Sequence, residues 1–182
     1  MLDFSEPLAI KKEIIKICGA LIRVVNDKFP SELKMQIFLA LKLIQQKYAD
    51  STKAMAAQLQ TTFLKALGDS SMNEHVLRVI LENMILLVKG LTRVDPIIKE
   101  LLSLLDGNKI EGSQKQLVAE ALALIIRAKG KVITSTMQET LAASLTEILQ
   151  NAPSLTGNND IITANCAVAM AFLSAYADPG QM

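Results

Sequence analysis

The chain has 182 residues and a formal net charge of +1, and 51% of its residues are hydrophobic while only 4% are aromatic. This composition favours helices packed through leucine, isoleucine and alanine over β-sheets. Lys42, Lys89 and Arg127 interrupt the longest apolar runs, so none reaches the roughly 18 residues of a membrane span. The first residues lack the basic start and apolar run of a secretory signal, and we expect a soluble cytoplasmic protein.

The small net charge hides a gradient along the chain. Residues 1–65 carry ten basic and six acidic side chains, whereas residues 132–182 carry no basic side chain and four acidic ones. Such a gradient can be no more than a solvated surface. It also suits a chain whose basic end faces an acidic partner, and the sequence leaves both interpretations open.

Amphipathic helical patterns begin near the first residues. One helix is expected from about Pro7 to Asn26, and a second from Ser31 to about Tyr48, after the break at Pro30. A polar turn at residues 50–52 is expected to cap the third. This helix has the clearest pattern, with three apolar residues four positions apart and a left-handed glycine stop: Leu59, Phe63, Leu67 and Gly68.

Three capping boxes mark further helix starts, because a serine and a glutamate or glutamine three residues later satisfy each other's backbone N–H groups. They predict helices from about residues 71, 113 and 135, and Pro96 predicts another between the first two. Gly90, Gly107 and Gly130 are expected to stop helices. The boxes are Ser71 with Glu74, Ser113 with Gln116, and Ser135 with Gln138.

An uncharged loop at residues 151–159 precedes the last helix, expected from about Ile161 to Tyr176 with Asp160 as its cap. In a repeat protein each unit buries its apolar face on a neighbour, so an incomplete repeat leaves such a face uncovered. We therefore expect this helix to contact another molecule through Val168, Met170, Phe172 and Leu173.

Similar helix endings recur at intervals of 42, 38 and 44 residues, at Val25, Leu67, Leu105 and Leu149. These spacings bracket the roughly 40 to 47 residues of HEAT-type repeats. The predicted fold is an all-α HEAT-type helical-repeat solenoid of about eight helices. We expect a single segment of a larger protein, with a partial repeat at 1–29, repeats at about 30–69, 70–107 and 112–151, and a partial repeat at 160–177.

No pattern typical of an enzyme is recognisable. The single histidine, His75, has no potential metal ligand at a suitable spacing, and no phosphate-binding or nucleophile motif occurs. Cys18 and Cys166 are expected to be small core residues. We expect neither catalysis nor a cofactor, metal or small-molecule substrate.

Second helices of HEAT pairs usually line the concave face, and the residues two before the aligned positions are Arg23, Lys65, Ser103 and Glu147. This row places two cations at one end. No aromatic residues are interleaved for base stacking, so sequence-specific nucleic-acid binding is not expected. The row fits a solvated surface as well as a partner-binding one, and the candidate binding residues are Arg23, Lys65, Lys16 and Lys12.

Three blocks, at residues 19–29, 58–67 and 92–96, carry a resemblance to a known family. In order they read GALIRVVNDKF, QLQTTFLKAL and TRVDP. The chain resembles the C-terminal HEAT-repeat region of the general-control translational activators, which are ribosome-associated activators of the initiation factor 2 alpha kinase. The second block is the most specific of the three.

The resemblance implies a non-catalytic scaffold that holds the RWD domain of the kinase, in a protein that binds ribosomes. It also implies that Arg23 matches a family residue that binds the kinase. The chain has Gly19-Ala20 where the family has Gly-Pro, so its first helix is expected to run straight. The loop at 151–159 departs from the family and leaves the role of that end open.

A generic HEAT scaffold of another assembly, such as a transport receptor or a phosphatase subunit, is the alternative. A transport receptor would bind a small GTPase or a basic targeting peptide, for which an acidic concave surface is suitable. In this chain the acidic residues are concentrated only towards the carboxyl end.

Overall fold

The computed structural model describes residues 8–25, 29–67, 69, 73–107, 110, 112–151 and 158–176. These residues form nine α-helices and one short 3-10 helix, without any strand among them. The all-α helical-repeat fold expected from the sequence is therefore confirmed. The chain divides into two compact units, residues 1–90 and 91–182, and each is described by itself. Within the described ranges, no helix is both long and apolar enough to cross a membrane.

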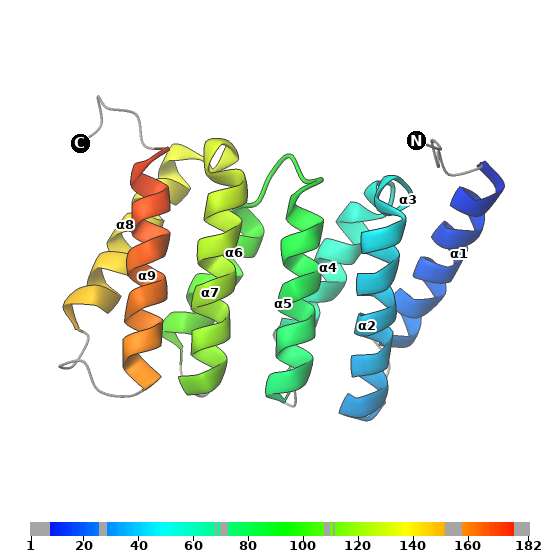
Figure 1. Ribbon diagram of the computed structural model, residues 1–182, viewed down its shortest axis with the longest axis horizontal. Helices are drawn as coiled ribbons and strands as arrows, with labels where there is room; N and C mark the ends of the chain where they lie inside the picture. The colour runs from blue at the N-terminus through cyan, green and yellow to red at the C-terminus, as the bar shows by residue number, and fades with distance from the viewer. Residues whose placement is uncertain are drawn as a thin grey trace. The chain divides into compact units, whose positions relative to one another are not determined.

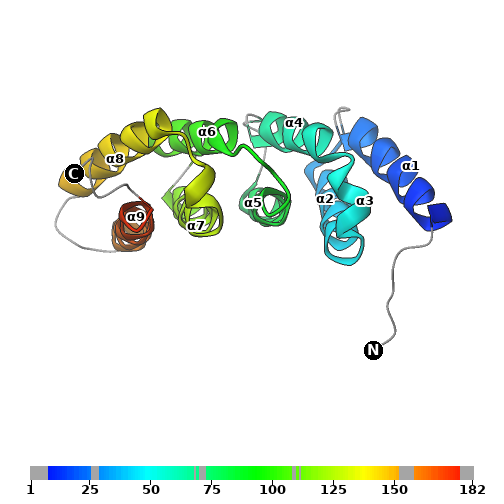
Figure 2. The ribbon, with the colours of Figure 1, turned by 90° about the horizontal axis from the view of Figure 1, so that it is seen from above.

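Unit 1 has two layers of helices (Figure 1, Figure 2). One layer holds α1 (Leu8–Val25) and α4 (Ala56–Leu67), and the other holds α2 (Ser31–Lys47) and α5 (Glu74–Val88). The short helix α3 (Ala49–Lys53) connects α2 to α4. Helix α2 packs along α5, while α1 contacts α2, α3 and α4.

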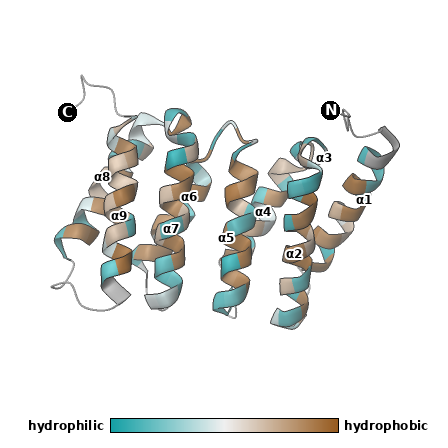
Figure 3. Cartoon of the chain, viewed as in Figure 1, coloured by the Kyte–Doolittle hydropathy of each residue, from teal (hydrophilic) through white to brown (hydrophobic). Residues whose placement is uncertain are grey.

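The apolar stripe predicted for the third helix forms the centre of unit 1. Leu59, Phe63 and Leu67 of α4 are all buried. The ring of Phe63 lies 6.1 Å, centre to centre, from the ring of Phe38 on α2, tilted by 54°. Tilted aromatic pairs at this distance add to the free energy that burial provides. Figure 3 shows hydrophobic and hydrophilic residues alternating along the helices, as expected of helices that bury one face.

Unit 2 repeats the two-layer arrangement (Figure 2). Helices α6 (Asp95–Asp106) and α8 (Ser135–Gln150) form one layer, and α7 (Gly112–Lys129) and α9 (Asn158–Ser174) form the other. The 3-10 helix η1 (Gly130–Val132) follows α7 directly. Helix α9 packs extensively against α7 and less against α8.

Part of the apolar face expected on the last helix is covered. Leu173 is buried, and Phe172 lies partly buried beneath the guanidinium of Arg127, 5.7 Å from the ring centre. Only Val168 of the four predicted contact residues is exposed, together with Ile161. A contact with another molecule therefore stays a prediction for the outer side of α9.

Several helix starts differ from the predicted ones. The amino cap of α5 is Asn73, whose side-chain oxygen accepts a hydrogen bond from the Val76 N–H at 3.0 Å, whereas Ser71 lies outside the described residues. Residues 50–52 belong to α3 and do not form the polar turn expected to cap the next helix. Helix α7 begins at Gly112 and α9 at Asn158, so the predicted caps Ser113 and Asp160 lie inside their helices.

The cap of α8 is replaced by a tertiary contact. Thr134 occupies the cap position, and its hydroxyl donates to Asp95 at 3.0 Å and makes no cap bond to its own helix. Ser135 is the first helical residue, and the Gln138 side chain donates to the carbonyl of Ile133 at 3.3 Å. The predicted box of Ser135 and Gln138 is therefore wrong, because Asp95, 39 residues away, is the partner at this helix start.

The helices end next to the predicted glycines, because α5 ends at Val88, α6 at Asp106 and α7 at Lys129, but Gly90, Gly107 and Gly130 do not adopt the left-handed conformation. Gly107 follows α6 in an extended conformation, with φ of −80° and ψ of 169°. Gly130 begins η1, and a Cβ at this position would collide with the ring of Tyr176. The hydroxyl of Tyr176 donates to the Arg127 carbonyl at 2.9 Å, which holds the ring there. Gly130 is therefore needed for close packing. Gly68 lies outside the described residues.

Both cysteines are buried in the core, as predicted, with exposed fractions of 1% for Cys18 and 0% for Cys166. Burial raises the pKa of both thiols, because the thiolate would lose its hydration. The pKa of Cys166 rises to about 11 through burial and, to a smaller extent, the nearby carboxylate of Asp106. Both thiols therefore stay protonated at neutral pH.

This raised pKa predicts a loss of stability in alkaline solution. The folded state holds the Cys166 proton more tightly than the unfolded state, so stability is unaffected below pH 9 and falls as the pH rises towards about 11. Thermal melts of the wild type and of Cys166→Ala, recorded between pH 7 and 11, isolate this effect from other titrating groups. Above pH 9, the melting temperature of the wild type is expected to fall more steeply than that of Cys166→Ala. Parallel curves for the two proteins would contradict the assignment.

Candidate protein-binding surface

Helix α1 exposes a basic face. It buries Ile14, Cys18 and Val25, and it runs without interruption through Gly19-Ala20, as the sequence predicted. The opposite side carries Lys12, Lys16 and Arg23, which are four and seven residues apart and therefore share one face.

Apolar side chains accompany these cations on α1. Ile17 is 47% exposed and Val24 is 36% exposed. Exposed apolar residues beside a charged rim are typical of surfaces that bind other proteins. This combination was not predicted from the sequence.

Helix α4 places the remaining predicted residue beside α1. Ala57, Thr61 and Lys65 are exposed and four residues apart, so they form one stripe. The hydroxyl of Thr61 donates to the Ala57 carbonyl at 3.0 Å. Alanine and threonine carry no charge, so Lys65 is the charged residue of the stripe. Lys65 lies in the last turn of the helix.

A shallow, open depression of about 350 Å³ lies between α1 and α4. Ile22 of α1 lines one side, and Thr62 and Lys65 are among the α4 residues on the other. Arg23 follows Ile22 in the chain. The fold thus brings the two helices that carry Arg23 and Lys65 together, while Lys12 and Lys16 do not line the depression. We call Lys12, Lys16, Ile17, Arg23, Val24, Lys65 and this depression the α1–α4 surface.

The charges of the α1–α4 surface are largely available to a partner. Lys16 forms an ion pair with Glu13 at 2.7 Å, but both side chains are well exposed, so this pair contributes little free energy. Among the described residues, Lys12, Arg23 and Lys65 have no ion-pair partner. Ser103 and Glu147, the other members of the predicted row, are exposed on helices of unit 2.

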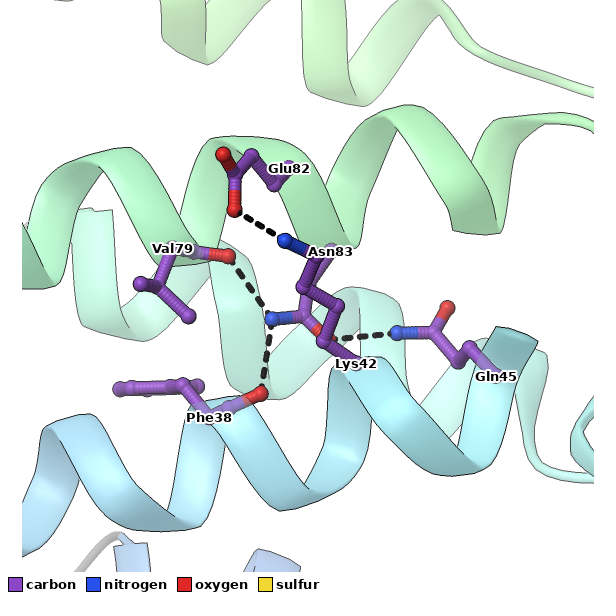
Figure 4. Close-up of polar contacts among 6 residues, drawn as sticks. All are labelled: Phe38, Lys42, Gln45, Val79, Glu82 and Asn83. Atoms are coloured by element: carbon purple, nitrogen blue, oxygen red, sulfur yellow. Dashed lines mark hydrogen bonds and ion pairs between the residues drawn. The ribbon is translucent and has the colours of Figure 1, made fainter. Parts of the chain in front are cut away.

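A buried polar network between α2 and α5 was missed by the sequence analysis (Figure 4). The amide nitrogen of Asn83 donates to the carbonyls of Phe38 and Val79 at 2.9 and 2.8 Å, and its oxygen accepts from Gln45 at 2.6 Å. At its edge, Lys42 pairs with Glu82 at 2.7 Å. The signal that could have revealed it is the position of Asn83, which follows Val76 by seven residues and Val79 by four and so lies on the apolar face of the helix.

The chemistry of an enzyme is not visible in the described residues. No three histidine, cysteine, aspartate or glutamate side chains among them are grouped so that they could hold a metal ion. His75 lies exposed in the first turn of α5. The exposed cations and apolar residues of α1 and α4 make this surface a candidate for binding a protein.

No family model matches the chain, and no solved structure matches it either. The chain is 29% identical over 158 residues to the stalled ribosome sensor GCN1 of Mus musculus, a match that covers 87% of this chain and 6% of the relative. It is 31% identical over 123 residues to the eIF-2-alpha kinase activator GCN1 of Saccharomyces cerevisiae, covering 68% of this chain and 5% of the relative.

A third relative, the eIF-2-alpha kinase activator GCN1 of Dictyostelium discoideum, is 43% identical over 65 residues, or 36% of this chain and 2% of the relative. The chain thus spans 6% or less of the length of these relatives. The matches come from mammal, yeast and amoeba and agree with the family suggested by the three sequence blocks. The chain belongs to the GCN1 family, as a homologue of one segment of these long proteins.

Proposed function

We propose that this chain is a non-catalytic helical scaffold that binds the RWD domain of the initiation factor 2 alpha kinase through the α1–α4 surface, and thereby helps to activate the kinase on ribosomes. The supporting observation is a pair of exposed cations, Arg23 and Lys65, on two helices that enclose a shallow depression lined by Lys65 and by Ile22, the residue before Arg23. Two relatives are named as activators of this kinase. Ribosome binding by the longer protein, and a cytoplasmic location, are part of the proposal.

The guanidinium of Arg23 is the central contact of this proposal. Its planar fork can donate two parallel hydrogen bonds to one carboxylate, which sets the orientation of the partner. Ile17 and Val24 supply apolar area on the same helix, so a partner that covers them also removes water from around Arg23. Lys65, Lys12 and Lys16 act as more distant positive charges that accelerate association.

Replacing Arg23 with alanine is expected to weaken binding of the RWD domain by about 2 kcal/mol or more, or about thirtyfold in Kd. The change leaves the core intact, so thermal stability should stay within about 0.5 kcal/mol of the wild type. Calorimetric titration of the full chain with the RWD domain of its kinase measures the effect. Arg23→Lys, which keeps the charge but loses the fork, is expected to restore only part of the affinity.

Arg93→Ala is the matched control, because Arg93 is also exposed and, among the described residues, has no ion-pair partner. It should leave the Kd unchanged. Equal losses for Arg23→Ala and Arg93→Ala would show that only overall charge matters. No binding by a folded wild type would reject the proposal and favour the alternative, a generic HEAT scaffold such as a subunit of a transport receptor or phosphatase.

A further inference from the structure

We propose that unit 1 has a second binding site, separate from the α1–α4 surface, which takes a short acidic peptide segment of a partner protein. The site is a pocket of about 350 Å³ formed by residues from the ends of α2 and α5, from α3 and from the start of α4. Gln45, Lys53, Leu86, Leu87 and Lys89 are among its lining residues.

The buried network fixes a hydrogen-bond acceptor in this pocket. Asn83 donates both of its amide hydrogens to backbone carbonyls, which can only accept, so its side-chain oxygen must be the atom that faces Gln45. Gln45 must therefore present its nitrogen to Asn83. Its oxygen is directed away from Asn83, as Figure 4 shows.

Gln45 lines the pocket although the residue is only 7% exposed, and its side-chain oxygen has no hydrogen-bond partner among the described residues. The packing of α2 on α5 holds this side chain, so little conformational entropy is lost when a ligand donates to it. A backbone N–H of a peptide is a suitable donor. The oxygen is therefore a preorganised acceptor for a polypeptide.

The charges around the pocket favour an acidic ligand. Lys89 is exposed and, among the described residues, has no ion-pair partner. Lys53 pairs with the exposed Asp50 at 2.7 Å, and this lysine lowers the pKa of the Asp50 carboxyl, so only part of its charge remains available. None of the described residues that line the pocket is an aspartate or a glutamate. We therefore expect a ligand carboxylate to form an ion pair with Lys89 in preference to Lys53.

The wall of the pocket selects for an apolar residue next to the acid. Leu86 and Leu87 of α5 and Ala49 and Ala56 of α3 and α4 provide apolar surface. The volume is at the lower end of the range for ligand sites and accommodates one or two side chains. The ligand class is therefore an extended peptide that alternates apolar and acidic residues.

The test is a nuclear magnetic resonance titration of the full ¹⁵N-labelled chain with four peptides, acetyl-Asp-X-Asp-X-Asp-amide, where X is Leu, Phe, Met or Val. At least one of them should shift the amide signals of Gln45, Lys53 and Lys89 in a saturable manner. The same peptides with lysine in place of aspartate should not. A hexauridylate is titrated in parallel, because its phosphates would also be attracted to the lysines.

Two pairs of variants locate the site. Ala49→Phe fills the pocket and should abolish the shifts, whereas Ala54→Phe, at an exposed position outside the lining, should not. Lys89→Glu should weaken binding by about fivefold or more, while Lys99→Glu, an equal charge change in unit 2, should change it by less than about twofold. A thermal melt establishes that each variant is folded.

The proposal is supported if the acidic peptides bind the wild type and the control variants but not Ala49→Phe. It is overturned if no acidic peptide binds, if the lysine peptides bind equally, or if Ala49→Phe and Lys89→Glu both bind like the wild type. Shifts caused by the hexauridylate alone would overturn it in favour of a nucleic-acid ligand. Binding of the RWD domain is measured separately with Arg23→Ala, so the two proposals fail independently.

Discussion

Phe63→Ala is expected to lower the free energy of unfolding by about 3 to 5 kcal/mol. Phe63 of α4 is fully buried, and its ring packs against the ring of Phe38 on α2. Truncation removes the apolar area of the ring and the aromatic contact, and it leaves a cavity that the two helices can close only in part. Unit 1 should therefore become the less stable part of the chain.

Urea denaturation followed by circular dichroism measures this loss. Phe29→Ala is the matched control, because Phe29 is exposed and its truncation should cost less than about 1 kcal/mol. Any loss of partner binding by Phe63→Ala should follow the fraction of unfolded protein. A folded Phe63→Ala variant with wild-type stability would show that α4 does not pack on α2 through this ring.

The second large effect is expected at Asn83. Asn83→Leu should cost about 2 to 3 kcal/mol, although leucine has a similar size and is more hydrophobic. The substitution removes three hydrogen bonds and leaves the Gln45 amide nitrogen buried without its acceptor. The Phe38 carbonyl also loses a donor, so the desolvation cost of these groups outweighs the gain in apolar burial.

A double-mutant cycle separates this network from simple packing. Gln45→Leu combined with Asn83→Leu removes both partners, so no buried amide remains without a partner, and the double variant should be more stable than the sum of the single losses predicts. The unfolding free energies of the wild type, the two single variants and the double variant come from urea titrations at the same pH. Strict additivity would contradict the coupling, and a stabilised Asn83→Leu variant would show that the network has no energetic role.

The candidate binding surface was predicted only in part. The positions of Lys12, Lys16, Arg23 and Lys65 on exposed helix faces agree with the structure, because the period of a helix assigns each residue to a face. The depression beside Lys65 depends on α1 packing against α4, and these two helices are separated in the chain by α2 and α3. The exposed charges were therefore identified from the sequence, whereas the depression, which only Lys65 of these four residues lines, was not.

Helix capping shows the same limit. Asn73 caps α5 through a bond to Val76, three residues on, which is a local signal, yet the serine two positions earlier was preferred because it completed a motif. At α8 the local motif was present and was not used, because the carboxylate of Asp95, at the start of α6, accepts a hydrogen bond from the Thr134 hydroxyl. Several side chains near a helix start can act as its cap, and tertiary contacts determine which of them does so.

Periodicity within single helices was enough to locate the α-helices other than the short α3, the buried stripe of Leu59, Phe63 and Leu67, and both core cysteines, since these depend on residues three and four positions apart. Contacts between residues far apart in the sequence could not be predicted from periodicity and depend on how the helices pack. Gly130 is needed to make room for the ring of Tyr176, 46 residues later, and the amide of Gln45 is oriented by Asn83, 38 residues later. Such contacts form only when the helices are stacked, so the tertiary structure decided which partners Asn83 has and where the pocket beside them lies.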